Sequence, residues 1–411
     1  MVTKEEMIGP WVTNEFWVSP YNFEKDVTSR PEMPARIQLH DSTLRDGEQT
    51  PGVVFRKHEK VAIAKMLDEI GVDRIEAGMP AVSIEDQEAI REIASLGLNA
   101  EIYSLCNARE SDIDLAISCG TNSIVMGYPA GYPRLKYEFA KWTEEHAINV
   151  ALRAVSYAKD KGLKISFFLM DSSRSSKAFL ERLVTSLTKS APPDAFVVVD
   201  TSGCFLPAAA ANQVRFVKEI SGLPVEIHTH NDLGLGLAAT LAAIEAGAEV
   251  AHVCVNGLGE RGGNVALDEL VVALRCLYGR ETTIDYHRMT EVSKKVEALS
   301  NIPINRNKPV IGDGIYRRES GLGIDLVKKE PLAIYSMVPE TVGQKARIVL
   351  GKKSGVASID FKANELGIGG LTGEEQKRAV LTKVKERSIE KKAFLDDKEF
   401  REIVSSVLEG R

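Results

Sequence analysis

Short apolar runs alternate with longer amphipathic stretches across residues 36–278. The apolar runs have the length and composition of buried β-strands. The stretches between them carry apolar residues three and four positions apart, which predicts helices with one buried face. The predicted strands are 37–44, 74–77, 100–105, 123–126, 164–169, 195–199, 225–230 and 250–255. The predicted helices are 57–70, 83–93, 112–118, 146–161, 178–189, 208–220, 234–246 and 265–277.

Eight strands and eight helices in strict alternation predict the α/β fold class. Strands that are joined by helices run parallel, and eight such units over this length are what a (β/α)8 TIM barrel needs. A doubly wound sheet is the alternative. That fold normally carries G-x-G-x-x-G after its first strand, and this sequence does not. We therefore predict a TIM barrel over residues 36–278.

The regions on either side of this barrel have different patterns. Residues 1–35 place aromatic side chains among prolines and polar residues, which predicts an irregular arm that packs against another surface, such as that of another subunit. After residue 278 the alternation stops. Helical patterns at 290–299, 374–387 and 397–408 are separated by glycine-containing loops, so we expect residues 279–411 to form a linker and a small, mainly helical accessory region.

Composition narrows the class of protein. The hydrophobic fraction is 44% and the charged fraction is 27%, which is typical of a globular protein. A formal charge of −6 gives no electrostatic reason to expect nucleic acid binding. We see neither an apolar run of membrane-spanning length nor a signal peptide. The five cysteines lack any regular spacing, so we expect free thiols in a reducing compartment and a cytoplasmic enzyme.

Two histidines end the seventh predicted strand. Side chains two residues apart on a strand point to the same face, so His228 and His230 can bind one divalent ion from one side. Asp46 follows the first strand, which approaches the seventh as the barrel closes, and Asn264 can add an amide oxygen. The alternative is that the histidines are ordinary solvent-facing residues and Asp46 is a cap. Mg2+, Mn2+, Zn2+ and Co2+ all suit this donor set.

Groups that can bind an anion lie beside these residues. The guanidinium of Arg45 can hold a carboxylate in a fork, and Thr201 at the end of the sixth strand can donate to the same carboxylate. Gln49 is a further candidate substrate ligand in the loop of Arg45. A 2-oxo acid that chelates the metal would satisfy this arrangement. The alternative for Arg45 is a simple ion pair with Glu48 or Asp41.

Four motifs resemble the DRE-TIM metallolyase superfamily, and within it most closely the isopropylmalate, homocitrate and citramalate synthases. They are residues 40–49, 75–80, 228–232 and 256–264, with a weaker likeness at 342–355. The resemblance implies a divalent metal on Asp46, His228 and His230, with Arg45 on a 2-oxo acid and Thr201 on its carboxylate. It also implies attack by the enolate of an acyl-CoA, usually acetyl-CoA, then thioester hydrolysis, in a homodimer whose accessory regions cover the partner's active site.

The sequence departs from those synthases at two places. Met170 stands where they carry a glutamate, and residues 318–323 have lost both histidines of the linker motif. The second of these histidines is associated with removing a proton from the acyl-CoA, and Gly323 at its position cannot act as a base. Glu319 or Lys353 are the remaining candidates for that role.

Three hypotheses follow for the function. The first is a Claisen-type synthase, and the second is a lyase that cleaves a 2-hydroxy acid or its CoA thioester by a retro-aldol or retro-Claisen step. The third is a metal-binding relic without activity. Arg134, Lys136 and Lys141, after the fourth strand, either meet the CoA phosphates or form a solvated face.

Overall fold

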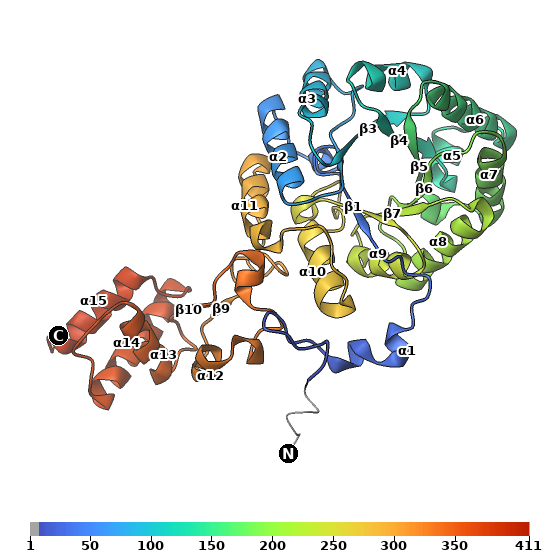
Figure 1. Cartoon of the computed structure of the whole chain (residues 1–411). Coiled ribbons are helices and arrows are strands. Elements are labelled where there is room, and N and C mark those ends of the chain that lie inside the picture. Colours follow the sequence, from blue (N-terminus) through green and yellow to red (C-terminus); the bar gives the residue numbers. More distant parts are fainter. Residues whose placement is uncertain (1–7, 322, 411) are drawn as a thin grey trace. The chain divides into compact units, whose positions relative to one another are not determined.

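The structure, a computed structural model, describes residues 8–321 and 323–410. Its central feature is a closed barrel of eight parallel strands in sequence order, in which β1 pairs with both β2 and β8 (Figure 1). The predicted TIM barrel is therefore confirmed. The strands are β1 (Gln38–Asp41), β2 (Arg74–Glu76), β3 (Glu101–Asn107), β4 (Ser123–Pro129), β5 (Lys164–Met170), β6 (Ala195–Asp200), β7 (Val225–Thr229) and β8 (Val250–Val253).

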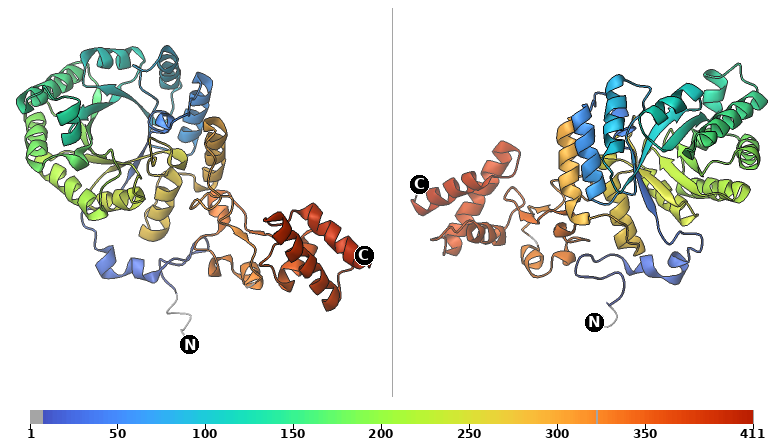
Figure 2. Two further views of the ribbon diagram at one scale, coloured as in Figure 1. Left: turned by 180° about the vertical axis from the view of Figure 1, so that it is seen from behind. Right: turned by 45° about the horizontal axis from the view of Figure 1, so that its top comes forward.

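Helices surround the strands of the barrel (Figure 2). In α7, for example, the buried side chains Phe179, Leu180, Leu183, Val184 and Leu187 recur at the spacing that predicted the helix. A further helix, α11 (Met289–Ser300), contacts α2. The ring consists of α2 (Lys57–Glu69), α3 (Ile84–Ser95), α4 (Glu110–Ser118), α6 (Glu144–Asp160), α7 (Lys177–Ser190), α8 (Pro207–Ser221), α9 (Gly236–Glu245) and α10 (Leu267–Tyr278).

The barrel interior has two chemically different halves. Charged and imidazole side chains come from β1, β2, β7 and β8, and Arg74 on β2 donates to Glu226 on β7 at 2.7 Å. An apolar cluster comes from β3 to β6. This cluster contains Tyr103, Val125, Phe168, Val197 and Val199, with Leu105 and Met170 packed against it. A molecule at the barrel mouth therefore meets a polar wall on one side and an apolar wall on the other.

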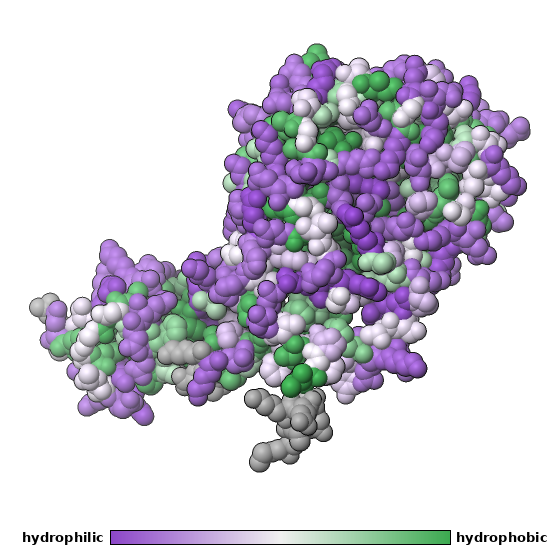
Figure 3. All heavy atoms as spheres, viewed as in Figure 1, coloured by the Kyte–Doolittle hydropathy of each residue, from purple (hydrophilic) through white to green (hydrophobic). Residues whose placement is uncertain are grey.

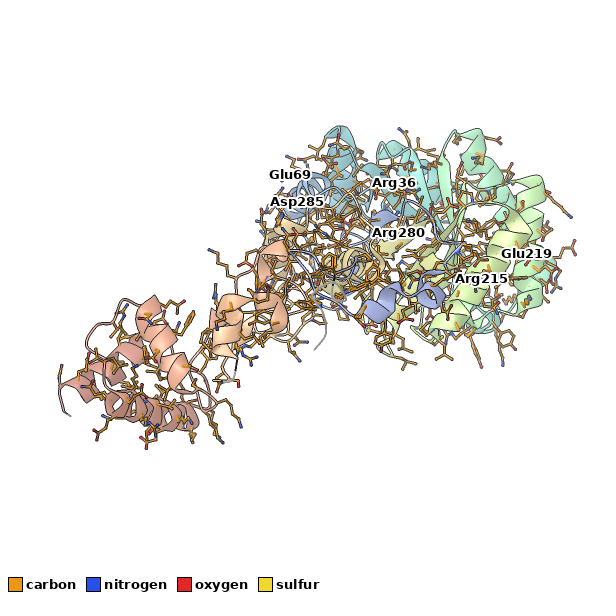
Figure 4. All side chains as sticks on the ribbon, turned by 60° about the horizontal axis from the view of Figure 1, so that its bottom comes forward. Arg36, Glu69, Arg215, Glu219, Arg280 and Asp285 are labelled. Atoms are coloured by element: carbon orange, nitrogen blue, oxygen red, sulfur yellow. The ribbon has the colours of Figure 1, made fainter. Side chains whose placement is uncertain are left out.

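The two ends of the barrel also differ. At the amino ends of the strands, charged side chains near the surface are paired, as in Arg36 with Asp73 (2.6 Å) and Glu69 with Arg288 (3.0 Å); Arg36 and Glu69 are labelled in Figure 4. Such pairs add little stability individually and keep this face polar. The functional side chains described below lie at the opposite, carboxyl end, where TIM-barrel active sites occur.

The residues that precede the barrel pack within this chain. Arg30 forms an ion pair with Glu245 at 2.9 Å and lies over the ring of Tyr278. Further toward the amino terminus, Phe16 bridges to Met337 in an antiparallel pair. Of the described residues, 24–304 form one compact unit and 8–23 with 305–410 form the other. The arm therefore contributes to both units.

The second unit is mainly helical, as predicted. Its core is built from α13 (Val356–Glu365), α14 (Glu374–Lys391) and α15 (Asp397–Leu408), which bury Ile359, Val380, Val384, Phe400 and Val404. A short helix, α12 (Ile324–Lys329), and a two-residue parallel pair, β9 (Arg317–Arg318) with β10 (Arg347–Ile348), precede this core. Hydrophilic residues cover most of the visible surface of each unit (Figure 3). Among the described helices, none has the length and apolar character needed to cross a membrane.

Candidate metal centre and active site

Three potential metal ligands converge at the carboxyl end of the barrel. Asp46 Oδ2 lies 3.1 Å from His228 Nε2 and 3.5 Å from His230 Nε2, and the two Nε2 atoms are 3.4 Å apart. All three side chains are buried. His228 is part of β7 and His230 lies just beyond its end. The two residues are two positions apart, so both imidazoles lie on the same side of the chain. The His230 N–H donates to the carbonyl of Asp200. The strand ends at Thr229, one residue earlier than predicted.

The spacing of these atoms fits a single divalent ion. Ligand atoms at about 2.1 Å from an ion are about 3.0 Å apart at right angles and about 3.4 Å apart in a tetrahedron. The two imidazole planes meet at 66°, so their in-plane lone pairs can point to a common centre. Asp46 Oδ1 is buried and has no hydrogen-bond partner among the described residues, which leaves it free for a ligand. The donor set is therefore suited to a divalent metal.

The electrostatics of the three groups favour their ligating forms. Burial would raise the pKa of Asp46, but Arg45 and His228 outweigh that effect and hold its pKa well below the usual range. Burial lowers the pKa of His228 to about 3 and also lowers the pKa of His230. Near neutral pH the carboxylate is therefore charged and both imidazoles are neutral, which is the state that binds a metal.

Arg45 is held beside this centre by a residue of the neighbouring strand. Its Nε forms a 2.9 Å ion pair with Oε1 of the buried Glu76 at the end of β2, and its Nη1 donates to Gln49 at 3.2 Å. These contacts pair Arg45 with Glu76 and Gln49, and not with Glu48 or Asp41 as the alternative proposed. Its Nη2 is buried with no hydrogen-bond partner in the described part of the chain. The guanidinium is thus oriented by protein groups and keeps one edge for a ligand.

Glu76 was not predicted as a site residue. Its position at the end of the second predicted strand was a signal, because functional groups collect at strand ends in this fold. What the sequence does not show is that its carboxylate orients Arg45. Burial would raise the pKa of Glu76, but Arg45 and His40 together outweigh burial and hold its pKa well below the usual range, so the carboxylate is ionised.

Thr201 and Asn264 lie on loops that follow β6 and β8. The Thr201 hydroxyl oxygen accepts a hydrogen bond from the backbone N–H of Asp171 at 2.8 Å. The hydroxyl hydrogen therefore points away from Asp171 and can be donated in a hydrogen bond to another group. The side-chain nitrogen of Asn264 donates to the Leu258 carbonyl at 3.1 Å, which orients the amide and leaves its oxygen for a ligand. Asn264 also bridges to His230, so the loop after β8 meets the end of β7.

The two candidate bases belong to the second compact unit. Glu319 Oε1 accepts the backbone N–H of Lys353 at 2.9 Å, and the Glu319 carbonyl accepts the hydroxyl of Ser354 at 3.3 Å. The Glu319 side chain therefore orders the loop of residues 351–355. Gly323 has φ of 81°, in the left-handed region, and is the N-cap residue immediately before α12.

Two cavities lie near the carboxyl ends of the strands. One, of about 360 Å3, shares Arg45 and Gln49 with the site, and Val53, Val54, Met79 and Val82 give it apolar walls. The other, of about 370 Å3, lies between α5 (Tyr132–Tyr137), α6 and α7. Beside it, Arg134 pairs with Glu138 at 3.1 Å and Lys136 lies over the rings of Tyr132 and Tyr137. Whether Arg134, Lys136 and Lys141 meet CoA stays a prediction.

A second buried group of possible ligands, which the sequence did not predict, lies deeper in the barrel. It consists of His40, Glu226 and His252. The imidazoles of His40 and His252 stack 4.2 Å apart with planes only 6° from parallel, so their in-plane lone pairs cannot meet at one ion. Glu226 instead accepts a hydrogen bond from His252 at 2.9 Å and another from Arg74 at 2.7 Å. We interpret this group as a hydrogen-bonded core.

Comparison with known proteins identifies the family of this chain. The model of the HMGL-like family matches residues 36–296. Homocitrate synthase AksA of Methanothermobacter thermautotrophicus is 37% identical over 392 residues, which cover 95% of this chain and 98% of that protein. Two proteins of Methanocaldococcus jannaschii are similar. One, 2-isopropylmalate synthase, is 41% identical over 82% of this chain and 64% of its own length, and the other, (R)-citramalate synthase CimA, is 40% identical over 85% and 70%.

Solved structures support the fold. The HMG-CoA lyase of Bacillus subtilis has a TM-score of 0.57 at 18% identity, and the comparison covers 66% of this chain and 96% of that one. A closed parallel barrel with a carboxylate and two imidazoles at its carboxyl end defines a TIM-barrel enzyme with a candidate metal site. The chain belongs to the HMGL-like family, as the resemblance predicted. It is an enzyme of the homocitrate, isopropylmalate and citramalate synthase type.

Proposed function

We propose that this enzyme condenses acetyl-CoA with a 2-oxo acid on a divalent ion held by Asp46, His228 and His230, with Asn264 as a further oxygen ligand. The observation that carries the proposal is the convergence of one carboxylate oxygen and two Nε2 atoms within 3.5 Å of one another. The relatives named above, which are synthases of this type, support the reaction class.

When bound, the ion would polarise the keto group and stabilise the negative charge that develops on its oxygen. The protein groups have separate tasks. Arg45 offers its free Nη2 to the 2-oxo acid while Glu76 and Gln49 fix the plane of the guanidinium. The Thr201 hydroxyl, which accepts a hydrogen bond from the backbone N–H of Asp171, would donate a hydrogen bond to the substrate carboxylate. Binding the acid in this one orientation lowers the entropic cost of reaction.

The substrate side chain points toward the apolar half of the barrel mouth in this proposal. The 2-oxo carboxylate belongs with Arg45 and Thr201, so the carbon chain faces the apolar cluster, where Met170 ends β5 and Leu105 lies on β3. A second carboxylate in such surroundings would lose hydration without gaining a charged partner. We therefore propose a 2-oxo acid with an uncharged aliphatic side chain, as in citramalate or isopropylmalate formation, over the dicarboxylic acceptor of homocitrate formation.

The acyl donor would enter through the cavity beside Arg45. That cavity is next to the metal ligands, and its apolar walls suit the uncharged arm of an acyl-CoA. For removal of the acyl methyl proton we propose Glu319, with Lys353 as the alternative, because Gly323 has no side chain to take the proton. Glu319→Gln is expected to lower kcat more than Lys353→Met does.

A lyase remains the second candidate, and one observation favours it. Cleavage of a 2-hydroxy acid needs no base to generate an enolate from an acyl-CoA, and the chain has lost the histidine at position 323. Release of a 2-oxo acid from 2-hydroxy dicarboxylic acids, with no thiol released from acetyl-CoA, would identify this reaction.

The experiment is a substrate panel on metal-reconstituted protein. Thiol release from acetyl-CoA is measured with pyruvate, 2-oxobutyrate, 2-oxoisovalerate and 2-oxoglutarate, with Asp46→Ala as the negative control. We expect release with one or more of the aliphatic acids and little with 2-oxoglutarate. Release with 2-oxoglutarate alone would contradict the side-chain assignment but not the reaction class. Equal rates in the Asp46→Ala protein would contradict the metal mechanism.

We also propose that the enzyme is a homodimer. Several loops that follow barrel strands carry exposed apolar side chains, namely Val54, Val82, Leu206 and Leu233. A surface of this kind is suited to being covered by a second copy of the chain. Sedimentation velocity would test this, with a monomer at micromolar concentration as the contradicting result.

A further inference from the structure

We propose that the ion pair between Asp232 and Arg261 is a positioning device that couples the metal ligand His230 to the substrate hydroxyl of Thr201. The inference rests in part on the proposed function, because it assumes that Thr201 meets the substrate. Among the described residues, no hydrogen bond or ion pair joins Asp232 or Arg261 to the atoms of Asp46, His228 and His230 that would bind the metal. The pair acts through the backbone of three loops.

The side chain of Arg261 reaches all three loops. It belongs to the loop after β8, where its Nη1 donates to Glu260 at 2.9 Å. Its Nε donates to Oδ1 of Asp232 at 2.9 Å, in the loop after β7. Its Nη2 donates to the carbonyl of Thr201, in the loop after β6. One planar guanidinium therefore fixes the relative positions of three chain segments.

Glycines allow these loops to approach Asp232 closely. A Cβ on Gly203 would lie 2.5 Å from the Asp232 nitrogen, and a Cβ on Gly262 would lie 2.7 Å from the Asp232 Cα. Both separations are too short for any side chain. The loop after β7 is thus packed between the loops after β6 and β8, with no room for a residue larger than glycine at either contact.

The backbone of Arg261 also indicates a functional constraint. Its φ of 55° lies in the left-handed region, which residues other than glycine adopt at an energetic cost. Such conformations persist where the surroundings hold them, and they collect at functional sites. The three hydrogen bonds of the side chain are the contacts that hold this one.

The consequence for the site is direct. Asp232 is two residues beyond His230, and the intervening Asn231 donates its N–H to the Gly263 carbonyl at 2.9 Å. A shift of Asp232 would therefore move His230 relative to Asp46. The same shift would release the Thr201 carbonyl and change the direction of the Thr201 hydroxyl. Metal binding and 2-oxo acid binding should consequently weaken together.

The test uses Arg261→Gln, Asp232→Asn and the double variant. The readouts are the dissociation constant for Mn2+, from competition with a chelating dye, and the KM for the 2-oxo acid that the native enzyme prefers. Each single substitution is expected to raise both constants roughly tenfold. The double variant should resemble the single ones, because the two changes break the same interaction. Arg261→Lys, which keeps the charge but loses the fork, should not restore either constant.

Arg182→Gln is the matched control. Arg182 forms an ion pair with Glu144 through two of its nitrogens, and its side chain is 54% exposed compared with 42% for Arg261. This variant should leave both constants unchanged. Constants within twofold of the native values in Arg261→Gln, or single effects that multiply in the double variant, would overturn the proposal. A native protein that bound Mn2+ but condensed no 2-oxo acid would refute the proposed function, and the Mn2+ constants would still decide the role of the pair.

Discussion

Asp41 at the end of β1 shows how burial changes the chemistry of a single residue. Its side chain is fully buried, and Oδ1 accepts the backbone N–H of Thr43 at 2.9 Å. Oδ2 has no hydrogen-bond partner among the residues that the structure describes. Burial raises the pKa of Asp41 to about 7. The neutral carboxyl is therefore the form that the fold prefers, and ionisation has an energetic cost.

This shift predicts a pH-dependent effect of Asp41→Asn. The folded-state pKa is above the unfolded value, so the native protein has the full contribution of this residue below about pH 4 and loses it as the pH rises through 7. Asparagine keeps an acceptor for Thr43 and never ionises. The variant should be more stable than the native protein by roughly 2–4 kcal/mol at pH 8.5, with little difference at pH 4.

Urea unfolding at the two pH values measures this difference. A stability difference that is the same at pH 4 and pH 8.5 would show that Asp41 does not titrate in the folded protein as its burial implies.

Residues that act as ligands were predictable from sequence, whereas residues that act on other residues were not. His228 and His230 are two apart on a strand, and Asp46 follows a strand that closes the barrel beside them, so period and topology suffice. Glu76 and Arg261 differ. Glu76 acts by pairing with the guanidinium of Arg45, and Arg261 acts by donating to the carbonyl of Thr201. These contacts form only when separate loops have folded together, so the spacing of residues along the chain does not predict them.

At the scale of elements, Lys60 connects α2 to two neighbouring segments. Its side chain is 2% exposed, and its Nζ meets Glu48 Oε2 at 2.5 Å and the Leu44 carbonyl at 3.3 Å. It also contacts Asp86 in the first turn of α3. The loop that carries Arg45 and Asp46 is thus tied to two helices by one buried ammonium group.

Lys60→Met should destabilise the protein strongly. It removes the positive partner of two carboxylates that are largely buried, and breaking a buried pair costs about 3–5 kcal/mol. Lys57→Met is the control on the same helix, because Lys57 is 38% exposed and its ammonium pairs with the exposed Glu88 and Glu92. That variant should change the free energy of unfolding by less than about 1 kcal/mol. Equal effects of the two substitutions in urea unfolding would contradict the role given to Lys60.

Element prediction succeeded where a hydrophobic period is long and failed where elements are short. The barrel strands and their helices follow from repeated apolar spacing. The six-residue α5 and the ten-residue α13 were not predicted, since α5 is only six residues long and α13 directly follows a glycine-containing loop. The two-residue strands β9 and β10 have no period at all and exist only because they pair with each other.

The whole molecule consists of two units with separate cores. The core of the second unit centres on Phe400, which is 1% exposed among residues of α13, α14 and α15. Phe400→Ala should destabilise that unit by about 3–5 kcal/mol through the cavity that it leaves. Calorimetry should then show an earlier, separate transition, while Mn2+ binding by the barrel is retained.

Leu408→Ala is the control for that variant, because Leu408 in the same helix is 38% exposed. It should leave the transition close to its native temperature. A single transition that shifts as a whole in Phe400→Ala, with loss of Mn2+ binding, would show that the two units do not unfold independently.

The account depends on one divalent ion bound by Asp46, His228 and His230, and the most direct measurement is the stoichiometry of Co2+ binding followed by its visible absorption. We predict one ion per chain in the native protein, none in His228→Ala, and one in a folded His252→Ala, because His252 belongs to the stacked core. Absence of stoichiometric binding in the native protein, or unchanged binding in His228→Ala, would contradict the account.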